Sequence, residues 1–235
     1  MVISQEERYL FIHIPKTAGT SLTHAMIKET GISPTSIQGV DGKDHEIITH
    51  SGALQLKQML GKHYDGLYSF SVVRNPWDRM VSLYNFKIQS AQQRLTGKRP
   101  QKPGTSKEGD MKEIAYLSTL GFERWLLEGD CDSHLYGESL TRLPQLCWLT
   151  DEDGKVIVSH IAKFEDLDSE LKKLQERFRM NFEGPTGNPS IHAPWSLYYN
   201  EETFACVQAR FQADIQMFGY EMSWDQVQQN QANLK

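Results

Sequence analysis

The chain has 235 residues, of which 39% are hydrophobic and 23% are charged, and its net charge is −5 at neutral pH. This composition is typical of a soluble globular protein, and the mild negative charge argues against a general nucleic-acid-binding protein. The length suits a single domain over residues 1–235, large enough to bury a sizeable core.

The cysteines and the absence of long apolar runs predict where the protein works. Three cysteines are odd in number and follow no ligand spacing, which favours a reducing compartment without a disulfide framework or a metal cluster. They are Cys131, Cys147 and Cys206. No run of 18 apolar residues occurs, and the amino-terminal residues do not resemble a signal peptide. We therefore expect a cytoplasmic protein without a transmembrane segment and without a resident metal.

The first predicted strand leads into the most informative segment of the chain. An apolar run over residues 9–14 stops at Pro15, and a helix is predicted over residues 20–30. The loop between them holds Lys16 and a series of small residues, namely Thr17, Ala18, Gly19, Thr20 and Ser21. Such a loop presents backbone N–H groups at the positive end of a helix, so it predicts an anion site.

The order of residues in this loop excludes the common nucleotide-binding motifs. A Walker A loop places its lysine after the second glycine, whereas Lys16 precedes Gly19. Neither a Gly-Lys-Ser/Thr triplet nor a G-x-G-x-x-G motif occurs in the chain. A strand, a turn and a helix without any ligand is the alternative interpretation.

Further along, helical and strand-like segments alternate. Residues 31–45 are loop-like, and Ser51 begins a short predicted helix over residues 51–60. Residues 67–73 form a buried strand, and a helix capped by Asn75 follows to about residue 93.

The second half of the chain continues this alternation between two polar loops. The polar residues 96–113 predict a long mobile loop, with a basic character that suits an anionic acceptor or simple solvation. The remaining predictions are a helix over 114–128, a strand within 155–164, a helix over 166–180, a Pro/Gly-rich loop over 183–196, and a helix from Asn200 to Gly219. Strands separated by helices predict an α/β fold with a parallel sheet.

A second candidate site follows the strand over residues 67–73. Arg74 stands where the strand ends, and Ser82 lies about two turns into the next helix. A guanidinium at a strand end can hold a phosphate, and a serine hydroxyl can add a hydrogen bond. Because ligands bind beyond the carboxyl ends of parallel strands, the Lys16 loop and Arg74 are expected at one sheet edge.

Together the segments 15–21 and 73–79, with Ser82, resemble the two nucleotide-binding segments of family 2 sulfotransferases. This group includes the carbohydrate and glycosaminoglycan 2-O-sulfotransferases and bacterial members, and it uses 3′-phosphoadenosine 5′-phosphosulfate (PAPS). The segments 161–167 and 214–220 are also similar to the group. The resemblance implies a P-loop-type three-layer fold with a central parallel sheet flanked by helices. Because the sequence shows no signal-anchor, the resemblance implies a bacterial-type cytoplasmic enzyme.

Carried over to this chain, the resemblance implies a role for each matched residue. Lys16 and the loop through Ser21 hold the 5′-phosphosulfate, and Lys16 also serves in catalysis. Arg74 and Ser82 hold the 3′-phosphate, and residues 186–195 occupy the place of the variable adenine loop. The acceptor is expected to be a hydroxyl compound, such as a carbohydrate or a glycolipid.

The general base that takes the acceptor proton is predicted to be His50. This residue lies between the two anchors and resembles the histidine that serves as base in the 2-O-sulfotransferases, and an imidazole suits neutral pH. His45 and Glu46 are the alternatives for this role. The spacing H-E-x-x-x-H from His45 to His50 misses the zinc-protease spacing by one residue, so no metal is expected.

The sequence also allows alternative interpretations for one aromatic cluster and for the function. Trp195, Tyr198 and Tyr199 form an aromatic cluster that fits core packing better than stacking on an adenine. A P-loop kinase-like phosphotransferase is an alternative function that the missing Gly-Lys-Ser/Thr triplet opposes. A non-catalytic protein that binds PAPS or its product is the other alternative.

Overall fold

The computed structural model describes residues 2–3, 9–30, 36–38, 44–46, 50–101, 104–128, 143–179 and 192–234. The chain divides into two units, residues 1–74 with 144–188 and residues 75–143 with 189–235. Each unit is described by itself, and the expectation of one domain over residues 1–235 stays a prediction.

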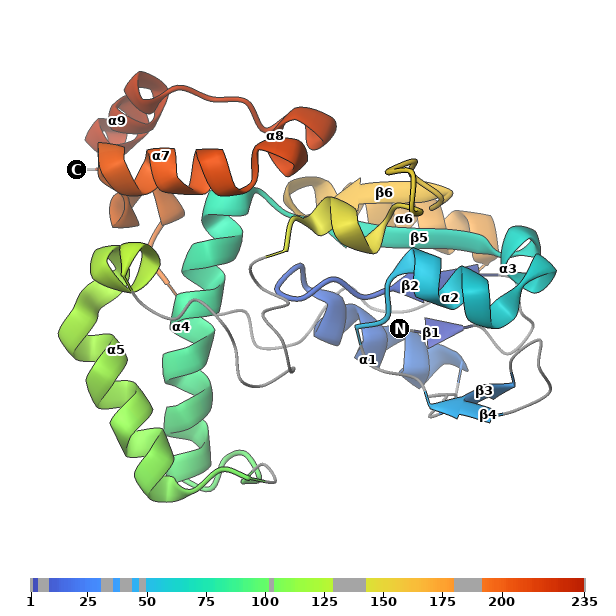
Figure 1. Cartoon of the computed structure of the whole chain (residues 1–235), viewed down its shortest axis with the longest axis horizontal. Helices are drawn as coiled ribbons and strands as arrows, with labels where there is room; N and C mark the ends of the chain where they lie inside the picture. Colours follow the sequence, from blue (N-terminus) through green and yellow to red (C-terminus); the bar gives the residue numbers. More distant parts are fainter. Residues whose placement is uncertain are drawn as a thin grey trace. The chain divides into compact units, whose positions relative to one another are not determined.

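The first unit is organised by a four-stranded sheet in the order β1-β2-β5-β6 (Figure 1). Its strands are β1 (Val2–Ile3), β2 (Tyr9–Ile12), β5 (Tyr68–Val73) and β6 (His160–Lys163). The last three are mutually parallel, and β1 pairs antiparallel with β2. All four residues of β2 and five of the six in β5 are buried, as expected for central strands covered on both faces.

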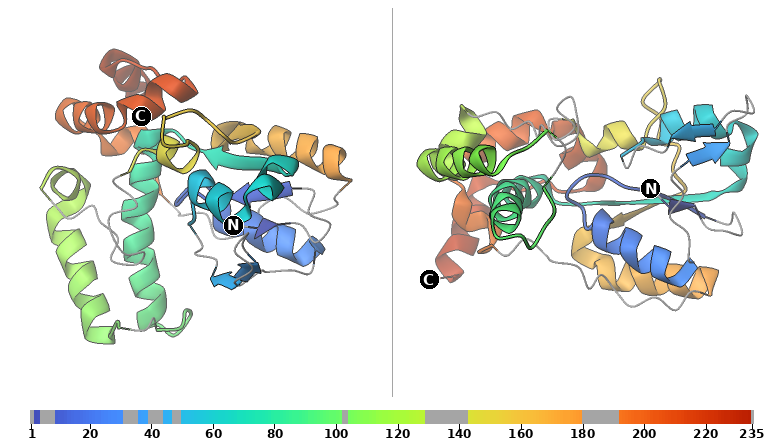
Figure 2. Two further views of the ribbon diagram at one scale, coloured as in Figure 1. Left: turned by 45° about the vertical axis from the view of Figure 1, so that its right-hand side comes forward. Right: turned by 90° about the horizontal axis from the view of Figure 1, so that it is seen from below.

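Helices cover both faces of this sheet (Figure 2). On one face, α1 (Gly19–Thr30) and α6 (Leu167–Phe178) pack on side chains of β2, β5 and β6. On the other lie α2 (Ala53–Leu60) and the short α3 (Lys62–Gly66). The predicted three-layer α/β fold is confirmed, with an antiparallel edge strand added to the parallel sheet.

Residues 31–45, predicted as loop, contain structure that the sequence pattern missed. The strands β3 (Ser36–Gln38) and β4 (Asp44–Glu46) pair antiparallel, with Ile37 opposite His45. The loop prediction was wrong for these residues because three-residue, mostly polar strands carry no apolar alternation from which a strand could be recognised. The helix expected from Ser51 begins two residues later, with Gly52 as its N-cap.

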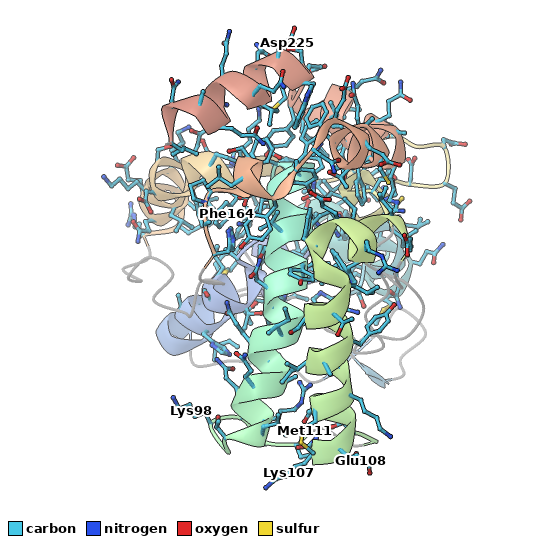
Figure 3. The ribbon with its side chains drawn as sticks, turned by 90° about the vertical axis from the view of Figure 1, so that its left-hand side faces the viewer. Lys98, Lys107, Glu108, Met111, Phe164 and Asp225 are labelled. Atoms are coloured by element: carbon cyan, nitrogen blue, oxygen red, sulfur yellow. The ribbon has the colours of Figure 1, made fainter. Side chains whose placement is uncertain are left out.

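The second unit is helical. The long helices α4 (Pro76–Leu95) and α5 (Lys107–Leu127) lie side by side, with Lys98 and Lys107 at the end where they are connected (Figure 3). The side chain of Asn75 accepts hydrogen bonds from the amides of Trp77 and Asp78, so the predicted cap of α4 is confirmed.

The carboxyl-terminal helices of this unit complete its core. They are α7 (Glu201–Arg210), α8 (Gln212–Phe218) and α9 (Trp224–Asn233). The ring of Trp77 stacks on Phe204 with centroids 4.6 Å apart, and its indole N–H donates to the Phe204 carbonyl. The single helix expected from Asn200 to Gly219 is interrupted at Phe211, and α9 was not predicted.

A buried ion pair corrects the prediction of a loop over residues 96–113. The helix α5 begins at Lys107, and Asp110 in its first turn receives hydrogen bonds from Arg94 of α4 and from Gln101. Both members of the Arg94–Asp110 pair are 2% exposed. The hydrogen bonds from Arg94 keep the pKa of the Asp110 carboxyl below its usual value. Residues 107–113 looked like loop because their one buried side chain is a carboxylate, which adds nothing to an apolar pattern.

No helix in the described part of the chain combines the length and the apolar character that a bilayer span requires.

Replacing Asp110 with Ala should lower the free energy of unfolding by about 3–5 kcal/mol, because Arg94 would remain buried without its partner. Urea unfolding followed by circular dichroism measures the change. As a control, Glu108→Ala removes the partner of Lys112 in the same helix, where both side chains are more than 70% exposed. The control substitution should lower the free energy of unfolding by less than about 1 kcal/mol. Equal effects of the two substitutions would contradict the assignment of Asp110 as the anchor of α5.

Candidate functional site

The loop between β2 and α1 has a backbone shaped to hold an anion. Lys16 and Ala18 have positive φ angles of 69° and 65°, and Thr17 between them does not. Positive φ angles at alternate residues can turn backbone N–H groups toward one concavity, as in the backbone nests that bind anions. Each positive φ at a residue other than glycine costs about 1–3 kcal/mol, and such strain is concentrated at functional sites.

Local contacts hold this loop in place. The buried hydroxyl of Thr17 donates to the carbonyl of Ile14 at 3.0 Å, and the amide of Leu22 donates to Ala18 at 3.1 Å, which starts α1. Thr20 is exposed and Ser21 is half-buried. The loop therefore lies at the N-terminus of α1, with the Thr17 side chain bonded back to Ile14, and its role as an anion site stays a prediction.

Gly19 is fixed by the side chain of His13. A Cβ atom added at Gly19 would overlap the imidazole of His13, including its Cγ at 2.7 Å. The imidazole thus lies directly against the backbone where α1 begins. Glycine is required here by this close approach, since no other residue lacks a Cβ.

His50 is held in a single orientation beside the loop. It is buried, its Nδ1 lies 3.0 Å from the carbonyl oxygen of His13, and its own carbonyl accepts from the indole N–H of Trp148. A carbonyl can only accept, so Nδ1 carries the proton and Nε2 is left as the proton acceptor of the neutral ring. Nε2 of a neutral, oriented imidazole is the atom that a general base needs.

Arg74 reaches the same loop from the end of β5. Its Nη1 donates to the carbonyl of Lys16 at 3.3 Å, and its guanidinium lies 4.3 Å from the centre of the Phe164 ring. The side chain is 7% exposed. The first unit therefore brings together Lys16, His50 and Arg74, three of the predicted residues.

Gln145 is a site residue that no sequence motif indicates. Its amide is wholly buried, accepts from the N–H of Arg74 at 2.9 Å and donates to the carbonyl of Arg74 at 2.8 Å. These bonds pair both backbone groups of Arg74 just beyond the strand. The partners are 71 positions apart, and a glutamine in a short Leu-Pro-Gln-Leu segment has no local signature of such a role.

The other predicted site residues belong to the second unit, lie on β4, or fall outside the described residues. Ser82 is buried on α4 in the second unit, so its cooperation with Arg74 stays a prediction. His45 and Glu46 lie on β4, whereas His50 is in a turn before α2, so these residues do not share a helix as a zinc-protease motif requires. Of the predicted adenine loop 186–195, residues 186–191 lie outside the described residues.

The aromatic cluster of the second unit packs as predicted for a core. The hydroxyl of Tyr199 donates to the carbonyl of Trp77 at 2.8 Å. The ring of Trp195 stacks on that of Trp77 with centroids 6.2 Å apart. Tyr199 is 4% exposed, while Trp195 and Tyr198 are half-buried. In the same unit, His192 lies 4.0 Å from the carboxylate of Asp78.

Among the described residues, no three His, Cys, Asp or Glu side chains are grouped so as to hold a metal ion.

Comparison with known proteins places the chain among sulfotransferases. The family model described as "Sulfotransferase family" matches residues 1–221. A crystal structure of mouse sulfotransferase SULT7A1 complexed with PAP aligns with a TM-score of 0.44 at 13% identity, covering 99% of this chain and 91% of that chain. A search of curated protein sequences found no match.

Replacing Gln145 with Leu should destabilise the protein by at least about 2 kcal/mol, because it removes both hydrogen bonds between the buried Gln145 amide and the backbone of Arg74. Chemical denaturation measures the difference. The same substitution at the exposed Gln58, whose amide bonds Glu152 on the surface, serves as control and should change stability by less than about 0.5 kcal/mol. A Gln145→Leu variant as stable as this control would show that these hydrogen bonds do not hold the end of β5.

Proposed function

Since the chain belongs to the sulfotransferase family, we propose that PAPS is its sulfuryl donor and that a hydroxyl compound, a carbohydrate or a glycolipid, is its acceptor. The observation that carries this proposal is the nest of residues 16–18 at the start of α1, with Arg74 bonded to it.

In this proposal the loop stabilises the negative charge that develops on the leaving phosphate oxygen. As the sulfur–oxygen bond to the 5′-phosphate breaks, negative charge builds on that oxygen, as it does in phosphoryl transfer. Donors that are already oriented stabilise such charge without reorganising. The Lys16 ammonium and the amides of residues 17–21 fill this role in the proposal, because the backbone of residues 16–18 already has the conformation of an anion nest.

His50 provides the base. In the proposed step, Nε2 of His50 takes the proton from the acceptor hydroxyl as the acceptor oxygen bonds to sulfur. The bond from sulfur to the phosphate oxygen breaks, and the products are the sulfate ester and 3′-phosphoadenosine 5′-phosphate (PAP). The hydrogen bond from Nδ1 to the His13 carbonyl supports this assignment, because it places the proton of the neutral ring on Nδ1 and therefore the lone pair on Nε2.

Arg74 and Ser82 are proposed to hold the 3′-phosphate. A guanidinium offers several N–H donors in one plane, so Arg74 can donate to the Lys16 carbonyl and also present donors to a phosphate. Stacking on Phe164 limits the orientations of this side chain. The serine hydroxyl adds one hydrogen bond from α4.

We also propose that the protein acts in the cytoplasm.

Isothermal titration calorimetry with PAP tests the nucleotide assignment. The wild-type protein should bind one PAP per chain, and Lys16→Ala should weaken binding at least tenfold by removing a charge from the nest. Adenosine 5′-monophosphate, which lacks the 3′-phosphate, is the control ligand and should bind more weakly. Absence of PAP binding at high micromolar concentration, together with magnesium-dependent ATP turnover, would instead support a phosphotransferase.

The His50→Ala variant should retain PAP affinity within about threefold but lose roughly 10²–10⁴-fold in kcat, the usual contribution of a general base. Transfer from radiolabelled PAPS to fractionated carbohydrate and lipid extracts gives the rate. His63→Ala, which removes an exposed imidazole from α3, is the control and should keep full activity. Full activity of His50→Ala would move the base role to His45 or Glu46. PAP binding without transfer by the wild type to any acceptor pool would indicate a non-catalytic nucleotide-binding protein.

A further inference from the structure

His13 contacts both the anion loop, at Gly19, and the proposed base His50, yet it takes no part in the proposed transfer step. It follows β2, one residue before Ile14, and only 4% of it is exposed. Burial lowers the pKa of its imidazole well below the ordinary value, and a charge on His50 lowers it further. His13 is therefore neutral at physiological pH and is unsuited to hold an anion itself.

The first contact joins His13 to the loop. Its ring lies so close to Gly19 that any side chain at position 19 would overlap it. Gly19 is the first residue of α1 and directly follows the left-handed Ala18. The ring thus limits how far the start of α1 can move toward the sheet.

The second contact joins His13 to the proposed base. The imidazoles of His13 and His50 meet edge to face, with centroids 4.5 Å apart and planes at 65°. The backbone carbonyl of His13 also accepts the Nδ1 proton of His50 at 3.0 Å. One residue therefore sets the tautomer of His50 through its backbone and restricts the orientation of the His50 ring through its side chain.

Packing alone does not explain an imidazole at this position. Nδ1 of His13 is buried without a hydrogen-bond partner in the described structure, and an unpaired buried polar group lowers the stability of the folded state. An aliphatic side chain of similar size would fill the same volume without that cost. A planar ring, in contrast, can lie flat against the Gly19 backbone and still offer an edge or a face to His50.

We infer that His13 is a positioning residue, whose ring sets the spacing between the anion loop at Gly19 and the base His50. This inference rests on the proposed function, because it assigns His13 a part in the same reaction. It predicts that changes at His13 reduce the rate of transfer while nucleotide affinity and stability are largely kept. A displacement of about 1 Å in a reacting group can reduce a rate by about 100-fold.

The central experiment compares His13→Leu with the wild type. Leucine keeps the packing volume and the backbone carbonyl, so the free energy of unfolding should be unchanged or higher, and PAP affinity should stay within about threefold. The rate kcat at saturating PAPS should fall about 10- to 100-fold. The control Ile12→Leu changes a wholly buried residue of β2 and should keep kcat within about twofold.

A second set of variants tests the contact between His13 and Gly19 by changing Gly19. Gly19→Ala keeps the imidazole but forces it away, so kcat and PAP affinity should both fall. In the double variant His13→Ala/Gly19→Ala the overlap is gone, and PAP affinity should recover at least fivefold relative to Gly19→Ala alone. Such non-additivity is the signature of two residues in direct contact.

The outcomes separate this inference from the proposed function. If wild-type protein transfers sulfate but His13→Leu keeps kcat within twofold, or if the double variant shows no recovery, His13 is a packing residue and the inference is wrong. If the wild type neither binds PAP nor transfers sulfate, the proposed function itself is wrong. A drop in stability that accounts for the whole loss of activity in His13→Leu would also overturn the positioning role.

Discussion

The candidate site depends on the backbone of residues 16–18, where two residues other than glycine adopt left-handed conformations. This geometry is costly and has to be maintained by the surrounding structure. Three contacts maintain it: the Thr17 hydroxyl donates to the Ile14 carbonyl just beyond β2, Arg74 bonds the Lys16 carbonyl, and the ring of His13 lies against Gly19. An anion that binds the loop therefore meets N–H groups that are already oriented.

The contacts around this loop also connect it to the rest of the first unit. Arg74 extends the central strand β5 and is held by Gln145 through both of its backbone groups. His50 is bonded to His13 on one side and to Trp148 on the other. Segments after β2, before α2, after β5 and before β6 thus converge on the carboxyl end of the parallel strands, where α/β folds bind their ligands. The site is built by the sheet topology as much as by any single motif.

Buried polar groups explain where interpretation of the sequence failed. Asp110 and Gln145 are almost wholly buried, and each is essential to a local arrangement, yet neither adds to an apolar periodicity. The apolar pattern therefore predicts a loop for the first residues of α5, and it does not reveal the partner of Arg74. The short strands β3 and β4 were missed for a related reason, since backbone pairing holds them together and their side chains show no alternation.

The sequence by itself determined the family, the α/β class, the main strands and helices, and the candidate residues Lys16, Arg74, Ser82 and His50. It could do so because turns, caps and apolar periodicity are local, and because the two matched segments carry a specific order of residues. Only the tertiary structure decided that Arg74 bonds the Lys16 carbonyl, that Nδ1 of His50 bonds the His13 carbonyl, that the ring of His13 lies against Gly19, and that Gln145 bonds the backbone of Arg74. These features arise from contacts between residues up to 71 positions apart, which no local pattern encodes.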